Sequence, residues 1–236
     1  MLSTAHWPDV EAGPRRLLVV PVGSLEQHGA HLPLDTDTRI ATAVAVRACA
    51  GRPGVALAPP IAIGASGEHA DFPGTLSIGT VALSTLLVEL GRHASLDWPA
   101  MLLVNGHGGN AAAIRDAVKL LAYEGRRCRG WHAGLRPAML AAGESLVPDA
   151  HAGRVETSIM LALAPDDVRP GDAAAGETRP LTELMAGLRA RGVRQVSQNG
   201  VLGDPAGASA AEGERLLALL VADLAAAVGR LADAAG

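Results

Sequence analysis

The chain has 236 residues and a formal net charge of −4, and 49% of its residues are hydrophobic, which suffices for one large α/β domain. Aromatic residues make up only 2%, so alanine, leucine and valine must build the core. The absence of a basic run argues against nucleic-acid binding, and the absence of a long apolar stretch argues against a membrane span. Two cysteines without a CxxC motif, and no apolar leader segment, predict a reducing, cytoplasmic location.

Short apolar strands alternate with helices along the first half of the chain. Strands are predicted at Leu17–Val22, Val55–Ala58, Ala100–Val104 and Cys128–Ala133, and helices at Thr38–Ala50, Thr80–Ser95 and Ala111–Glu124. Strands separated by helices are typical of a parallel, doubly wound sheet with helices on both faces. We therefore predict a single three-layer α/β/α domain over residues 1–236, with a mainly parallel central sheet.

The pattern is weaker towards the two ends of the chain. Residues 1–14 and 164–180 are rich in proline and polar residues and are expected to be irregular. Helices are predicted at Leu135–Gly143, Val155–Leu163, Leu181–Ala190 and Ala208–Leu231, and an edge strand at Gly192–Val196.

Three polar inserts follow predicted strands or precede predicted helices. The first carries Glu26, His28 and Asp37, the second carries His107 within Asn-Gly-His-Gly-Gly-Asn, and the third carries His151 and Glu156. Parallel strands place their carboxyl ends on one edge of the sheet, so the first two inserts can converge. Taken singly, His107 could be a turn residue, His151 a capping residue and Glu156 an exposed helix residue.

Carboxylates and imidazoles gathered in this way suit a divalent metal. Asp37, at the start of a helix, can bridge two ions, and three carboxylates with two neutral imidazoles would largely offset two divalent charges. Two-metal hydrolases use such pairs of ions. The mixed oxygen and nitrogen ligands predict two divalent ions per chain and leave Fe²⁺, Zn²⁺ and Mn²⁺ open.

Five motifs, in order, resemble the creatininase family of metal-dependent amidohydrolases: GSLEQHGAHLPLDTD, EHADFPGTLSI, NGHGGN, HAGRVETS and GVLGDP. The resemblance spans residues 17 to about 213. It implies a three-layer α/β/α fold, a two-metal site and a homo-oligomer, often a hexamer. It also implies that Glu26, His28, Asp37 and His107 are metal ligands, with Asp37 bridging. His151 matches a catalytic histidine of the family.

The chain departs from the creatinine hydrolases of this family directly after His107. Those enzymes carry an aromatic residue and a metal-binding glutamate there, whereas this chain has Gly108 and Gly109. Glu156 is the best candidate for the replacement ligand. The double glycine is expected to open the site, and Arg154, which stands where many relatives have an acidic residue, is expected to change the preferred substrate charge.

The run PLDTDTRIA and the double glycine look most like the mycofactocin-system branch of the family. That branch trims a modified precursor peptide and releases its C-terminal dipeptide-derived piece. The resemblance therefore predicts a peptidase acting on a short modified peptide. His69 and Thr75, in a loop that is either substrate-facing or an ordered turn, are predicted to bind the substrate. The alternatives are hydrolysis of a small amide, such as a creatinine-like lactam or a formamide, and a non-catalytic binding protein.

Overall fold

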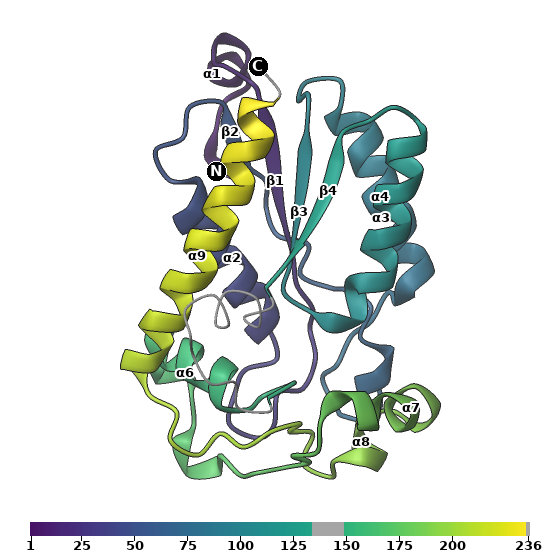
Figure 1. The fold of residues 1–236 in the computed structure, drawn as a ribbon, viewed down its shortest axis with the longest axis vertical. Helices are drawn as coiled ribbons and strands as arrows, with labels where there is room; N and C mark the ends of the chain where they lie inside the picture. The colour runs from purple at the N-terminus through teal and green to yellow at the C-terminus, as the bar shows by residue number, and fades with distance from the viewer. Residues whose placement is uncertain (134–148, 235–236) are drawn as a thin grey trace.

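The computed structural model describes residues 1–133 and 149–234. Four parallel strands form one sheet in the order β2-β1-β3-β4 (Figure 1). Their bounds are β1 Leu17–Val22, β2 Val55–Leu57, β3 Met101–Asn105 and β4 Cys128–His132. The predicted parallel sheet is confirmed. No helix of the described residues is long and apolar enough to cross a membrane.

Helices cover both faces of this sheet, which confirms the three-layer architecture (Figure 1). Along β1, Leu17 and Val19 face one layer, while Leu18 and Val20 face the other, as alternation along a strand requires. The first layer contains α2 Thr36–Cys49, α6 Arg154–Leu163 and α9 Ala210–Asp233. The second contains α3 Gly79–Ala94 and α4 Ala111–Tyr123.

The glycine at 213 lets α9 approach α6 closely, since a Cβ there would lie 1.9 Å from the carbonyl oxygen of Ser158.

The connections place a topological switch point between β1 and β3. The chain leaves β1 for β2 on one side and then crosses to β3 on the other side. At the carboxyl ends of the two central strands, Val22 is paired with Asn105. Ligands of open α/β sheets bind in the crevice beyond such a pair of strand ends.

Irregular segments and short helices gather beyond these strand ends (Figure 1). They include α7 Leu181–Arg191, α8 Val193–Val196 and the 3₁₀ turns η2 Gly67–His69 and η3 Gly108–Asn110. A small apolar cluster of Leu184, Val193 and Leu202 anchors this region.

Several details of the sequence prediction are corrected. The predicted edge strand at Gly192–Val196 is wrong: the chain turns at Gly192, with φ of 77°, and forms the short helix α8, which buries Val193 beside Leu184. The N-terminal segment contains η1 Leu2–Thr4 and α1 Trp7–Ala12. The 164–180 segment contains η4 Pro165–Asp167 and η5 Pro170–Asp172. The helix predicted at Leu135–Gly143 lies outside the described residues.

Candidate active site

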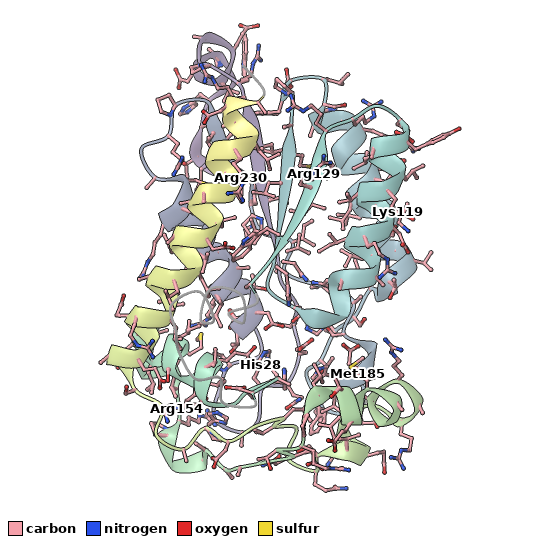
Figure 2. All side chains as sticks on the ribbon, in the orientation of Figure 1. His28, Lys119, Arg129, Arg154, Met185 and Arg230 are labelled. Atoms are coloured by element: carbon pink, nitrogen blue, oxygen red, sulfur yellow. The ribbon has the colours of Figure 1, made fainter. Side chains whose placement is uncertain are left out.

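The first two polar inserts meet where β1 and β3 end. Glu26 and His28 lie on the connection that follows β1, and Asp37 lies in the first turn of α2. His107 follows β3 directly. All four side chains are buried, and Figure 2 shows His28 beyond the carboxyl ends of the strands. The convergence expected from a parallel sheet is confirmed.

The third insert reaches the same place through long-range pairing. His151 forms an antiparallel bridge with Leu202, and the next residue, Ala152, has a positive φ of 54°. Helix α6 then begins, and Glu156 in its first turn accepts a hydrogen bond from the backbone N–H of Ala152 at 2.6 Å. The bridge and the helix start bring His151 and Glu156 to the cluster formed by the first two inserts.

Two sets of potential ligands share Asp37. His107 Nδ1 lies 3.1 Å from Glu26 Oε1 and 3.2 Å from Asp37 Oδ2. His28 Nε2 lies 3.2 Å from the other oxygen of Asp37, Oδ1, and 3.9 Å from Glu156 Oε2. Each set offers three ligand atoms that lie within 4.8 Å of one another. The two oxygens of Asp37 therefore face two different groups of ligands.

Backbone carbonyl groups fix which nitrogen of each histidine faces this cluster. Carbonyl oxygens only accept hydrogen bonds, so a ring nitrogen that contacts one must carry a hydrogen. His28 Nδ1 donates to the Glu26 carbonyl at 3.0 Å, and His107 Nε2 donates to the Ala65 carbonyl at 3.2 Å. His151 Nε2 donates to the Gln27 carbonyl at 2.7 Å. The remaining nitrogen of each ring is thus directed at the carboxylates, as in metal-ligating histidines.

The negative charges of the carboxylates favour a positive charge at the ring nitrogens of His28 and His107. Burial opposes ionisation of His28, but the charges of Asp37, Glu156 and Glu26 together raise its pKa to about 10. Burial also opposes ionisation of His107, yet Glu26 and Asp37 raise its pKa well above the usual range. Burial raises the pKa of Glu156 to about 8 against the opposing charge of His28, and the charges of Asp37 and Asp149 add to the rise.

The surroundings of the Glu26 carboxylate indicate whether a metal ion fits this site. Both of its carboxylate oxygens are buried, and within the described residues neither makes a hydrogen bond, although imidazole nitrogens lie 3.1 to 3.7 Å from Oε1. An unpaired buried carboxylate is costly. A divalent cation would satisfy Glu26 and replace the protons on the rings that face it. The residues present therefore fit the metal that the sequence predicts.

His151 differs electrostatically from the other two histidines. Burial, reinforced by the charge of His28, lowers its pKa well below the usual value, so the ring is neutral. Its hydrogen is on Nε2, which leaves a lone pair on Nδ1, 3.7 Å from Glu26 Oε1. The geometry leaves Nδ1 free to accept a proton, and it also places Nδ1 with Glu26 and His28 in a third group of potential ligand atoms.

Comparison with known proteins now identifies the family. A family profile described as creatininase, creatinine amidohydrolase, matches residues 3–228. The chain belongs to the creatininase family. Amide-bond hydrolysis is therefore its class of reaction, and solved creatininase structures include a Zn–Zn form and a Mn form.

Curated relatives of this creatininase-family chain include peptidases. A mycofactocin precursor peptide peptidase of Mycolicibacterium smegmatis is 54% identical over 211 residues, covering 87% of this chain and 81% of the relative. One from Mycobacterium tuberculosis is 49% identical over 222 residues, covering 90% and 84%. A creatinine amidohydrolase of Pseudomonas putida is 33% identical over 176 residues, covering 64% and 65%.

Solved structures agree with the fold. The Mn form of creatininase aligns with a TM-score of 0.75 and 27% identity, covering 96% of each chain. The Zn–Zn form of a creatininase variant aligns with a TM-score of 0.77 and 25% identity, again covering 96% of each chain.

The structure also places the two residues predicted to bind substrate. His69 lies within the cluster, with Nε2 3.3 Å from Glu26 Oε1. Thr75 lies beside it, where its hydroxyl oxygen accepts a hydrogen bond from the Gln27 backbone at 3.3 Å. Contact of either residue with substrate stays a prediction.

The structure bears on two further expectations about this creatininase site. A Cβ at Gly108 would meet nothing within 4 Å, as an open site requires, but one at Gly109 would lie 2.4 Å from Glu68 Oε1, His107 Nε2 and the Ala65 carbonyl. Gly109 thus allows close packing of Glu68, His107 and Ala65 and does not widen the site. The guanidinium of Arg154 pairs with Glu212 at 2.7 Å, and this contact gives no support for an effect on substrate charge.

Sequence reasoning passed over Ser24 and Gln27. The Ser24 hydroxyl donates to Asp37 Oδ2 at 2.6 Å, and the Gln27 side chain lies between His69 and His151. Neither type of side chain is a usual metal ligand, so a search for ligands does not find them. Their position within the same insert as Glu26 and His28 was the available signal.

Proposed function

We propose that this chain hydrolyses an amide bond near the C-terminus of a short modified peptide and releases a dipeptide-derived product. The observation that carries the proposal is the pair of ligand sets that share Asp37. The named activity of relatives that are 49 to 54% identical over most of the chain supports the peptide as substrate.

Two divalent ions per chain, of Fe²⁺, Zn²⁺ or Mn²⁺, are part of this proposal. Glu26, Asp37 and His107 would hold one ion, and His28, Asp37 and Glu156 would hold the other. Such ions polarise a carbonyl oxygen and make water nucleophilic at neutral pH.

His151 supplies the proton transfer that amide hydrolysis needs. The leaving nitrogen must gain a proton before it departs, and the attacking water must lose one. Nδ1 of His151 accepts the proton from the water and passes it to the leaving nitrogen. The Gln27 carbonyl keeps the ring in the required tautomer by holding Nε2–H at 2.7 Å.

A small amide, such as a creatinine-like lactam or a formamide, is the second candidate substrate. The 33% identity to the creatinine amidohydrolase of Pseudomonas putida favours it. The absence of a glutamate at the Gly109 position favours the peptide, because creatinine hydrolases of this family use that glutamate.

Product masses distinguish these candidates. Metal-loaded protein is incubated separately with the modified precursor peptide, with creatinine and with an N-formyl amine, and the products are identified by mass spectrometry. A dipeptide-sized product from the peptide alone is expected, and the His151→Ala variant serves as the matched control. Faster turnover of creatinine than of the peptide would contradict the proposal, and no turnover of any substrate would favour a non-catalytic binding protein.

We further propose a cytoplasmic homo-oligomer, a hexamer by family resemblance. Exposed apolar side chains on the segment that enters α3 support assembly: Leu76 is 54%, Ile78 38% and Val81 81% exposed. Light scattering at micromolar concentration is expected to give about six times the chain mass of 24.0 kDa. A monomer would contradict this part of the proposal.

A further inference from the structure

The side chain of Gln27 is buried between two histidines of the site. Its Oε1 accepts a hydrogen bond from the Gly29 backbone at 2.9 Å, which fixes the orientation of the amide. Its Nε2 lies 2.9 Å from His69 Nδ1, 3.1 Å from the Gly200 carbonyl and 3.0 Å from His151 Nε2. An amide nitrogen has two hydrogens, so these three neighbours cannot all be acceptors.

The backbone carbonyl of Gln27 shows which of these three neighbours accept the amide hydrogens. His151 Nε2 already donates its hydrogen to the Gln27 carbonyl at 2.7 Å, so this nitrogen has no lone pair for the amide. The two amide hydrogens therefore go to His69 Nδ1 and to the Gly200 carbonyl. Since Nδ1 of His69 accepts, the hydrogen of this neutral ring must be on Nε2.

His69 consequently directs a hydrogen at the cluster. In His28, His107 and His151, by contrast, a backbone carbonyl holds the hydrogen of the other ring nitrogen, so the nitrogen that faces the cluster can bind a metal or accept a proton. Its Nε2 lies 3.3 Å from Glu26 Oε1, the oxygen that His107 and His151 also approach. Because Nδ1 accepts the amide hydrogen of Gln27, it carries no hydrogen of its own, and the ring is neutral. The ligand sets that meet at the site do not include His69.

We propose that Gln27 and His69 are positioning residues: Gln27 fixes the tautomer of His69 so that its Nε2–H faces Glu26, and this keeps His69 out of the metal-ligand set. Ligating carboxylates and histidines are commonly oriented by such neighbouring hydrogen bonds. The inference rests on the proposed metal site and goes beyond it, because it predicts which of the buried histidines around Glu26 do not ligate.

The backbone around Gln27 is shaped for this side chain. Gly200 has a φ of 81°, and a Cβ there would lie 1.9 Å from Gln27 Oε1. Any other residue at 200 would displace the amide. The segment that carries Gly200 also carries Leu202, the bridge partner of His151, so one loop supports both histidines.

Substituting Gln27 by glutamate gives the sharpest test. A carboxylate has no hydrogen to give His69 Nδ1, so His69 must place its own hydrogen there. Its Nε2 then presents a lone pair to Glu26. In Gln27→Glu we expect His69 to change from the Nε2-H to the Nδ1-H tautomer, whereas Gln27→Met removes the amide without supplying an acceptor.

Ring ¹⁵N chemical shifts of the zinc-loaded protein report the tautomer of each histidine, and the signal of His69 is assigned by its loss in His69→Gln. The native protein is expected to show His69 protonated on Nε2. Zinc affinity is expected to fall about 10- to 100-fold in Gln27→Met, as for other residues that orient ligands. His69→Gln, which keeps an N–H donor, is expected to lose less affinity than His69→Phe.

His31→Gln is the matched control, since His31 is also buried but hydrogen-bonds Thr157 outside this relay. It should leave the His69 shifts unchanged, and thermal unfolding of every variant checks folding. An Nδ1-protonated His69 in the native protein would overturn the inference. So would unchanged zinc affinity in both His69→Phe and Gln27→Met, which would leave neither residue with a positioning role at the metal site. The NMR and affinity measurements involve no substrate, so failure of the peptidase assignment is separately visible.

Discussion

The two halves of the site are built in different ways. Glu26, Asp37 and His107 lie on the connections that leave the two central strands, and the sheet itself brings them together. His151 and Glu156 lie at the start of α6, and a single bridge to Leu202 and an unusual backbone conformation at Ala152 bring them in. The ends of the central strands position the side chains of the first half, and pairing between distant segments positions those of the second.

The supports of the two halves differ in the same way. Two buried asparagines brace the first half: Asn110 donates to the Gly23 carbonyl at 2.9 Å and accepts from the Ala65 N–H at 2.8 Å, and Asn105 donates to the His107 carbonyl at 2.7 Å. The second half is supported from the half-exposed side by the pair of Arg154 and Glu212. We infer that the first half serves as the fixed part of the site.

The largest expected effect comes from breaking the first half. His107→Ala removes the only imidazole of the Glu26 and Asp37 set, and catalytic ions supply several kcal/mol. We expect kcat/KM on the peptide to fall about 10³-fold or more. Steady-state kinetics checks this, with His93→Ala on the exposed face of α3 as the control. Activity within a few-fold of the native value would remove His107 from the site.

A smaller effect is expected from His151 in the second half. His151→Ala should retain its metal and lose about 10²-fold or more in kcat, because the ring transfers a proton and does not hold an ion. Elemental analysis of the variant alongside kinetics separates the possibilities. Loss of metal would make His151 a ligand, and lower stability with near-normal turnover would make it a structural residue.

The smallest effect is expected at the outer support of the second half. Arg154 is 39% exposed, and exposed ion pairs contribute about 0 to 1 kcal/mol, so Arg154→Ala should lower the free energy of unfolding by no more than that. Urea unfolding measures the change. The variant should also keep its preference among charged and neutral substrates, and a reversed preference would place Arg154 at the substrate after all.

The same contrast explains which parts of the fold and of the site can be predicted from the sequence. The apolar run of β1 and the polar residues after it predict Glu26, His28 and Asp37, because strand, loop and helix follow one another locally. Family resemblance added the role of His151, whose pairing with Leu202 about 50 residues later leaves no local signal. The packing of Glu68 against Gly109 and the fixed amide of Gln27 depend on side chains from distant segments, so spacing alone could not predict them.

Metal content of the native protein and two variants tests the central claim that Asp37 joins the two halves. We expect about two divalent ions per chain in the native protein by elemental analysis. Glu156→Gln, which weakens only the second ligand set, should leave about one, and Asp37→Ala should leave almost none, because each oxygen of Asp37 faces a different set. An Asp37→Ala protein that keeps two ions per chain would contradict the account.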